Sequence, residues 1–225
     1  MVRPQGSIRK PAKLPRHRPG QVGGVRDRNR QDTLDRITSA GLALFLADGT
    51  MGVSIDQIVE RAGIAKGSFY RYVSDKAELV GQIIGAVAAA VIHALDRCDR
   101  SLRVAKRERL ATIYLQLALE LAAIVERDPD RVLLYLQEAR APCGGARGAI
   151  HAFADQLTAR TIGLTEIARE HRLIREVDPR IAALTVIGAI DAILFAHLRD
   201  RTPRPGIDAP AVTGELVSII LDGIR

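Results

Sequence analysis

The chain has no tryptophan, and only 4% of its 225 residues are aromatic. A packed core must therefore come from Ala, Leu, Ile and Val, which supply most of the 47% hydrophobic content, and a chain of this length can bury a substantial core. Cysteine is scarce as well. Because Cys98 and Cys143 stand far apart and match no metal-ligand spacing, we expect free thiols in a reducing compartment, no metal site and no cofactor.

Long, uninterrupted apolar runs are also missing. The run from Ile83 to Leu95 is short and contains His93, and a later run is interrupted by Asp191. The N-terminus has no apolar segment of the kind found in signal peptides. These absences predict a cytoplasmic protein that has no membrane partner.

The motifs of common enzymes are absent too. The sequence contains neither Gly-x-Ser-x-Gly nor His-Glu-x-x-His. Residues 63–68 (GIAKGS) are faintly similar to a phosphate-binding loop, but the lysine precedes the second glycine and a helical pattern, not a strand, comes before it. We therefore predict that the protein is not an enzyme.

No segment alternates between apolar and polar residues with a period of two, so we expect no sheet and an all-α fold. Two Asp-Pro pairs, at 128–129 and 178–179, are typical of helix starts, because the acid caps the helix and proline suits its first position. The expected helices after the first 31 residues are 32–47, two short ones between 54 and 72, 75–99, 104–127, one from 129, 147–171, one from 179 and a final one from 210.

The net charge of +7 is unevenly distributed. Residues 1–32 hold nine Lys or Arg against two Asp, an excess of +7, so the remaining residues sum to zero. This segment is rich in Pro and Gly and has little apolar periodicity, so we expect residues 1–31 to form a disordered basic arm. Such an arm can add phosphate contacts or place an arginine in the minor groove of DNA. A solubilising tail or a misassigned start of the chain would have the same composition.

The most informative stretch begins at Ser54. Ser54 and Gln57 have the spacing of a capping box, and Gly63 suits the left-handed position that ends a helix. Asp75 is a second candidate cap, with the acid Glu78 three residues later in the first turn of the next helix. Between these signals lies a short helix that is too polar to be buried on all sides. The order predicts a helix-turn-helix, a motif that lays one helix in the major groove of DNA.

A longer pattern contains this stretch. It comprises Ala40, Leu44, Phe45, Gly49, Thr50, Ser54, Ile58, Ala62, Gly63, Ile64, Lys66, Gly67, Ser68, Phe69, Tyr70, Tyr72, Lys76, Glu78 and Leu79. In order and spacing it resembles the N-terminal domain of the tetracycline-repressor (TetR) family of bacterial transcription regulators. Val73 stands where the family usually has Phe, and Ala65 stands where Ser is common, which weakens the cap of the recognition helix.

We expect the contacts with double-stranded DNA to come from the recognition helix and from the starts of its neighbours. Arg71 lies one turn after Gly67 on the same face and is the best placed side chain for reading bases. The predicted set is Ser54, Lys66, Gly67, Ser68, Tyr70, Arg71, Tyr72 and Lys76. The tyrosines would donate hydroxyls to phosphates, with core packing as their alternative role. For Lys76 the alternative is a solvated charge.

The candidates for a ligand site are mostly polar side chains on otherwise apolar helix faces. They are Tyr114, Tyr135, Thr161 and Asp191, together with the neighbouring Phe153. A role as satisfied core or interface groups remains open for each of them. A pocket built around them would be mainly apolar and would take a hydrophobic or amphipathic small-molecule effector.

The resemblance implies that the middle helices enclose such a pocket and that the last two pair with a second subunit. Residues 181–198 are rich in small and branched side chains, and residues 212–224 carry a broad apolar face, so both suit a four-helix homodimer interface. The expected organisation is a basic arm (1–31), a DNA-binding domain (32–79) and a ligand-binding and dimerisation domain (80–225).

These predictions combine into one function. The protein would be a nucleoid-associated repressor that binds a palindromic operator as a dimer. A small, mainly apolar effector would release it by favouring a state in which the long helix from Asp75 tilts. The alternatives are a ligand-independent architectural factor, a regulator controlled by a protein partner, and an activator.

Overall fold

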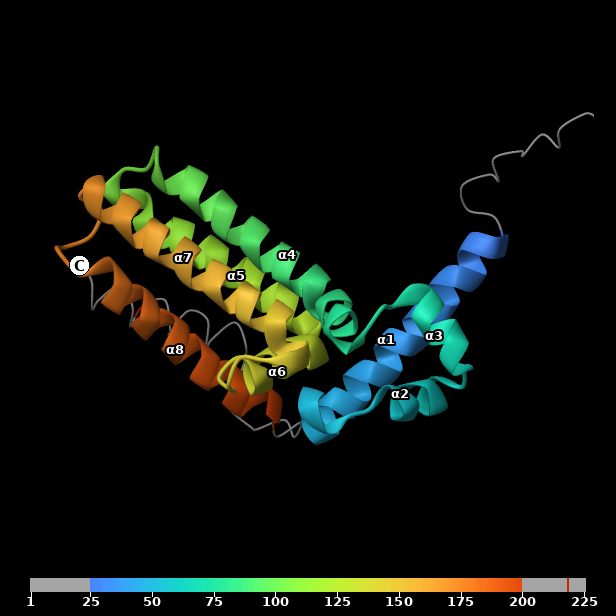
Figure 1. Ribbon diagram of the computed structural model, residues 1–225. Coiled ribbons are helices and arrows are strands. Elements are labelled where there is room, and N and C mark those ends of the chain that lie inside the picture. Colours follow the sequence, from blue (N-terminus) through green and yellow to red (C-terminus); the bar gives the residue numbers. More distant parts are fainter. Residues whose placement is uncertain (1–24, 200–217, 219–225) are drawn as a thin grey trace, which may run out of the picture.

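The computed structural model describes residues 25–199 and residue 218 (Figure 1). Residues 25–199 form eight α-helices and no strand, which confirms the predicted all-α fold. The helices are α1 (Val25–Gly52), α2 (Ile55–Ala62), α3 (Lys66–Tyr72), α4 (Lys76–Leu102), α5 (Leu110–Arg127), α6 (Pro129–Glu138), α7 (Gly148–Glu170) and α8 (Pro179–Arg199). Residues 1–24 of the predicted arm and the predicted helix from 210 lie outside the described residues, apart from the helical Ser218.

Helices α1, α2 and α3 form a small domain at one end of the molecule (Figure 1). Its core is built from apolar side chains that solvent does not reach, including Ile37, Phe45, Ile58 and Phe69. Val73, which replaces the larger residue common in the family, is 1% exposed and packs in the same core. The core therefore closes around the smaller valine side chain and leaves it inaccessible to solvent.

Helix α1 begins at Val25, so the prediction that residues 25–31 belong to a disordered arm is wrong. Residues 25–31 contain no proline or glycine, unlike the residues before them. Their helix is supported within its own turns: Thr33 donates to the carbonyl of Asn29 at 2.8 Å, and Gln31 donates to Asp35 at 2.8 Å. Near its other end the helix is interrupted at Gly49, whose φ of 73° is favourable for glycine alone.

The helix ends in the small domain follow the predicted signals. Ser54 and Gln57 form the expected capping box, and Gly63 adopts the left-handed conformation (φ 62°, ψ 42°). Asp75 accepts a hydrogen bond from the backbone N–H of Glu78 at 2.8 Å. Arg36 of α1 adds a contact that the sequence did not predict, because its guanidinium donates to the carbonyl of Gly63 at 2.7 Å. The turn between α2 and α3 is therefore fixed from inside and from α1.

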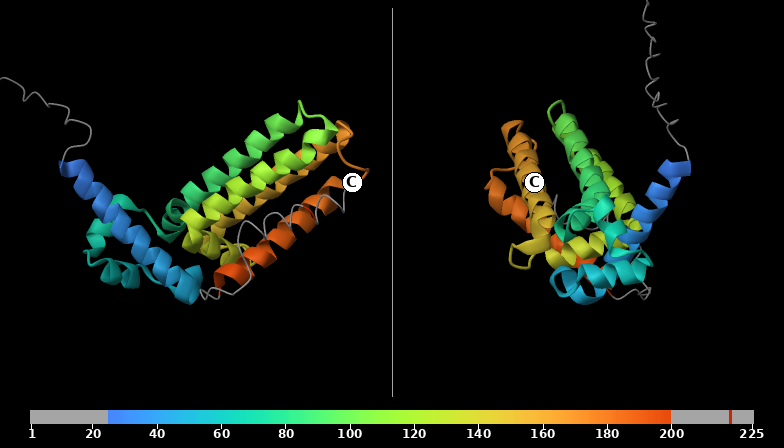
Figure 2. Two further views of the ribbon diagram at one scale, coloured as in Figure 1. Left: turned by 180° about the vertical axis from the view of Figure 1, so that it is seen from behind. Right: turned by 45° about the vertical axis from the view of Figure 1, so that its right-hand side comes forward.

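The larger domain is an elongated helical bundle. Helix α4 leads out of the small domain and runs along α5 and α7, and α8 lies beside α7 and α6 (Figure 1). The right-hand view of Figure 2 shows α4 and α5 on one side of the bundle and α7 and α8 on the other. The two domains share one core, because Leu79, Val80 and Ile83 at the start of α4 pack with residues of α1. Both α4 and α6 pack against α1, so a movement of either helix would change the contacts of the small domain.

Two helices, α4 and α8, are long and apolar enough to cross a membrane by length and composition alone. In α4, 39% of the apolar 18-residue stretch that could span a membrane is buried, and α4 packs against α1, α5 and α7 as a core helix does. In α8 the figure is 6%. Its exposed apolar residues lie in the segment that the sequence assigned to a subunit interface. The absence of a membrane partner stays a prediction.

Candidate DNA-binding surface and ligand cavity

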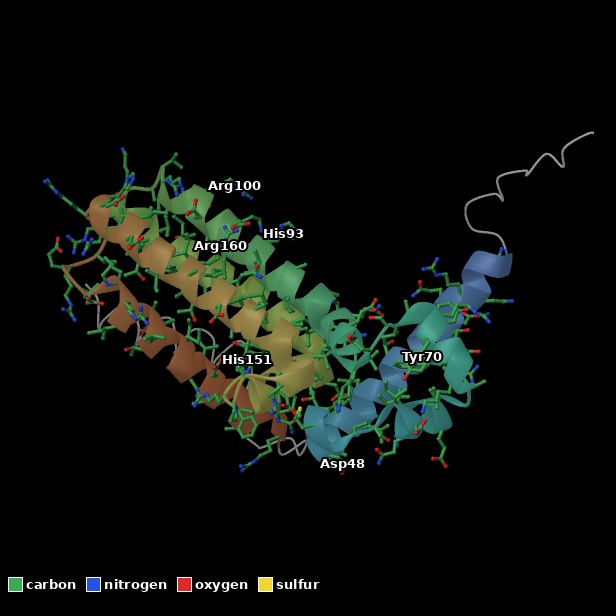
Figure 3. All side chains as sticks on the ribbon, in the orientation of Figure 1. Asp48, Tyr70, His93, Arg100, His151 and Arg160 are labelled. Carbon is green, nitrogen blue, oxygen red and sulfur yellow. The ribbon has the colours of Figure 1, made fainter. Side chains whose placement is uncertain are left out.

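The recognition helix α3 has one buried residue, Phe69, and presents most of its other side chains outward. Tyr70 is 50% exposed, and its ring packs edge-on against Phe69 with centroids 5.4 Å apart. Arg71 is exposed, and its side chain forms no hydrogen bond or ion pair within the described residues. Figure 3 places Tyr70 in the small domain, far from Arg100 at the other end of α4. This arrangement leaves an aromatic hydroxyl and a guanidinium free to meet a partner.

The first turn of α3 is open. A Cβ atom added to Gly67 would meet nothing within 4 Å, so packing inside the protein does not require glycine at this position. Lys66 forms an ion pair with Asp56 at 2.7 Å, and both side chains are more than half exposed. The hydrogen bond from Lys66 to Asp56 raises the pKa of the lysine, which is charged at neutral pH. An exposed pair of this kind contributes little to stability and is easily exchanged for another anion.

Three other predicted DNA contacts already have partners inside the protein. The hydroxyl of Ser54 caps α2 and lies 2.9 Å from the side-chain oxygen of Gln57. Lys76 donates from Nζ to the carbonyl of Val53 at 2.8 Å, and burial lowers its pKa, with a further contribution from the charge of Arg147. Tyr72 is half-buried against the shared core. Ser68 is likewise only half-exposed, so the eight predicted residues do not form one uniformly open surface.

A cavity of about 270 Å³ lies in the larger domain, among α4, α5, α6, α7 and α8. Its walls are mainly aliphatic. All five predicted ligand residues line it: Tyr114, Tyr135, Phe153, Thr161 and Asp191. They come from four helices and are brought together by the bundle, which the sequence alone could not establish. Thr165, one turn after Thr161, is a further polar residue of the wall that the sequence analysis missed.

The polar groups of the cavity are strongly affected by burial. Burial raises the pKa of Tyr114 and, for Tyr135, raises it to about 12, so both phenols stay neutral. Burial also raises the pKa of Asp191, against the effect of Arg140, whose guanidinium lies 3.7 Å from the carboxylate. Thr161 and Thr165 donate their hydroxyls to carbonyls of their own helix. The cavity therefore combines an apolar wall with a few polar groups, as small-molecule sites do.

Residues 37–83 match the family model described as "Bacterial regulatory proteins, tetR family". The match covers α2, α3 and the parts of α1 and α4 that pack on them. These residues form a TetR-family domain. The resemblance noted in the sequence is thereby confirmed, and the helix-turn-helix is the family's DNA-binding domain.

One curated relative matches well beyond this domain, at low sequence identity. The HTH-type transcriptional regulator TcmR of Streptomyces glaucescens is 27% identical over 161 residues, which are 72% of this chain and 62% of TcmR. The chain spans between 29% and 62% of the length of these curated relatives.

Solved structures share the fold over almost their whole length. NalD of Pseudomonas aeruginosa, the secondary repressor of the MexAB-OprM multidrug efflux pump, has a TM-score of 0.67 at 22% identity, covering 88% of this chain and 98% of NalD. AibR, solved in complex with isovaleryl coenzyme A and operator DNA, has a TM-score of 0.64 at 17% identity, covering 84% of this chain and 98% of AibR. At these identities the likeness shows the fold alone.

The junction between the two domains contains a buried carboxylate. Glu138, the last residue of α6, is 4% exposed and accepts a hydrogen bond from the backbone N–H of Thr50 at 2.7 Å. It is also paired with Arg147. Burial raises the pKa of Glu138, but the bonds from Arg147 and Thr50 outweigh that effect and hold the pKa below its ordinary value. Because Thr50 and Glu138 lie 88 positions apart in the sequence, no local pattern signalled their contact.

Proposed function

We propose that this protein is a transcriptional repressor that binds a palindromic operator as a homodimer and is released by a small, mainly apolar effector. One combination supports the proposal above all others: a helix-turn-helix with an open recognition helix is joined to a domain that encloses an apolar cavity. The names of the relatives, which are transcriptional regulators, agree with it.

In this proposal α3 lies in the major groove. Arg71 reads base edges, and the open surface at Gly67 lets the backbone approach the DNA closely. Lys66 exchanges Asp56 for a phosphate or a guanine, and Tyr70 donates its hydroxyl to a phosphate. Ser54, Ser68, Tyr72 and Lys76 complete the proposed contact set. Of these, Ser54 and Lys76 would have to share or give up the partners described above.

The coupling between the cavity and the DNA would run through both α4 and α6. Tyr135 and Leu136 of α6 line the cavity, and Glu138 at the end of the same helix holds Thr50 at the end of α1. A ligand that shifts α6 therefore acts on α1 directly, while α4 carries the same core into the small domain. The ligand changes DNA affinity only by its difference in affinity for the two states.

The first experiment is selection of bound sequences from random duplex DNA at about physiological salt. Enrichment of a palindrome with two half-sites supports a dimeric, sequence-specific regulator. Binding without an enriched motif supports the architectural alternative. Small molecules are then titrated against the selected operator. If no effector changes operator affinity, the release mechanism is wrong even though the protein binds DNA, and control by a protein partner becomes the better hypothesis.

The basic arm has a test of its own. Residues 1–24 carry six Lys or Arg and no acid. If these cations contact phosphates, deleting the segment lowers affinity and reduces the slope of log K against log salt by up to about five. A variant with the six cations replaced by Gln or Ser keeps the length of the arm and should behave like the deletion. An unchanged slope in both variants would mean that the arm does not contact DNA.

A further inference from the structure

We propose that the cavity selects a cationic amphiphile, with an apolar body in the aliphatic part of the cavity and an amine or quaternary ammonium group at Asp191. The inference rests on the proposed function, because it takes the cavity as the effector site. Among the described residues that line the cavity, Asp191 is the single charged side chain, and none is lysine, arginine or histidine. The wall thus offers one fixed negative charge and no positive one.

The carboxylate of Asp191 is poorly compensated by the protein itself. Its side chain is 16% exposed, whereas the guanidinium of Arg140 is 69% exposed and lies at 3.7 Å, beyond the length of a strong charged hydrogen bond. Burial raises the pKa of Asp191 in spite of Arg140. A buried charge with a weak partner is costly, and a cation arriving from the cavity side would remove that cost.

Aromatic rings line the same cavity as this charge. Tyr135 and Phe153 line the cavity with ring centroids 4.9 Å apart and an angle of 60° between their planes. Burial raises the pKa of Tyr135, and the charge of Asp191, which lines the same cavity, adds to that effect. Aromatic faces beside a carboxylate favour alkylammonium groups through cation–π attraction and a counter-ion together.

An anionic effector is the opposite hypothesis. A carboxylate or an acyl-coenzyme A would need positive groups at the site, and Arg140, the cation paired with Asp191, is not among the lining residues. An anion placed in the cavity would also lie against the carboxylate of Asp191. The observed charges therefore favour a cation, and the anion becomes an outcome of the test.

The test is calorimetric titration of the full-length protein with three probes that share a ten-carbon chain, each below its micelle concentration. Decyltrimethylammonium, decanol and decanoate differ mainly in the charge of the head group. We expect the cation to bind about tenfold more tightly than the alcohol, and the anion more weakly than either. Asp191→Asn should remove the preference for the cation and leave the affinity for decanol within about twofold, because the apolar wall is unchanged.

Two controls sharpen the result. Asp155→Asn removes an exposed carboxylate of α7 that does not line the cavity and should change no affinity. Arg140→Gln removes the weak partner of Asp191 and should tighten binding of the cation. Tightest binding of decanoate, lost in Arg140→Gln, would overturn the proposed charge preference but keep the cavity as a ligand site. If no probe binds while operator binding persists, both this inference and the effector role of the cavity are wrong, and DNA recognition alone stands.

Discussion

Arg71 differs from Lys66, Lys76 and Arg36 in having no hydrogen-bond or ion-pair partner within the described residues. Lys66 is paired with Asp56, Lys76 with Val53 and Arg36 with the end of α2. An unpartnered guanidinium on the exposed side of a recognition helix keeps all five donors for the bidentate contact that specifies guanine.

We therefore expect Arg71→Ala to weaken operator binding by about 1 to 3 kcal/mol and to relax the preference at one position of each half-site. The measurement is binding to the selected operator and to its single-base variants. Arg100→Ala removes the same charge from the far end of α4 and should leave both quantities unchanged. Equal losses for operator and random DNA in Arg71→Ala would assign this residue to a phosphate instead.

Lys66 and Lys76 carry the same charge in different surroundings, so they make a matched pair. Lys66→Met removes an exposed ion pair, and we expect a change in the free energy of unfolding below about 1 kcal/mol but a salt slope smaller by about one. Lys76→Met leaves the carbonyl of Val53 without its donor and should cost about 1 to 3 kcal/mol of stability. Thermal unfolding and salt-dependent DNA binding separate the two effects. A reduced slope with unchanged stability in Lys76→Met would make this lysine a phosphate contact.

At the scale of helices, the contact of α6 with α1 includes one buried carboxylate, Glu138. Glu138→Gln keeps an acceptor for Thr50 but leaves the charge of Arg147, whose side chain is 18% exposed, without its partner. We expect a loss on the order of 3 kcal/mol in the free energy of unfolding. Glu120→Gln is the matched control, because Glu120 pairs with Arg97 at the surface and its loss should cost less than about 1 kcal/mol.

The contribution of Glu138 also has a defined pH dependence. Its pKa in the folded protein lies below the ordinary value of 4.5, so the carboxylate stabilises the folded state above that value. This stability is lost as the pH falls through the lower, folded pKa. The difference in unfolding free energy between the wild type and Glu138→Gln should therefore be constant near neutral pH and shrink below about pH 4.5. A difference that does not vary down to pH 3 would contradict a charged role for this residue.

The helices could be predicted where the signal is local. Helix α2 is bounded by the cap at Ser54 and the left-handed Gly63, and α4 begins after the cap at Asp75. Each of these residues acts within one turn of its own position in the chain. Asp178 likewise accepts from the N–H of Ile181 at 2.9 Å, as its position before proline predicted. At Asp128 the same pattern correctly predicted that α6 begins at Pro129, but not the partners of the acid. That carboxylate pairs with Arg127 and Arg131 and makes no capping bond to the backbone.

What the sequence could not supply depends on contacts between distant segments. The bond between Thr50 and Glu138 joins residues 88 positions apart, and nothing in either neighbourhood signals it. Tyr114 and Asp191 were predicted as ligand residues because they are polar side chains on apolar helix faces. The same pattern could have belonged to an ordinary core. They share one cavity because the bundle brings α5 and α8 together around it. Periodicity gives the face of a helix and says nothing of which helix it meets.

At the scale of the whole molecule, the repressor that we propose would need a second subunit to match the two-fold symmetry of its operator. Helix α8 is the described element best suited to supply the contact. Ile181 and Leu184 are 67% and 49% exposed, although the helix is among the most apolar in the chain. Neither residue is part of the cavity wall, so changing them tests assembly without altering the proposed ligand site.

If the proposed dimer forms through α8, we expect Leu184→Glu to convert it into monomers in sedimentation equilibrium, because the variant places a charge in an apolar interface. Binding to an operator with two half-sites should then fall towards that of a single half-site. Leu119→Glu is the matched control, since Leu119 lies on α5 and has the same exposed fraction, 49%. Circular dichroism on both variants checks that the helices remain folded. Dissociation in Leu119→Glu with an intact dimer in Leu184→Glu would move the interface from α8 to α5, and the two recognition helices would then be separated by a different part of the bundle.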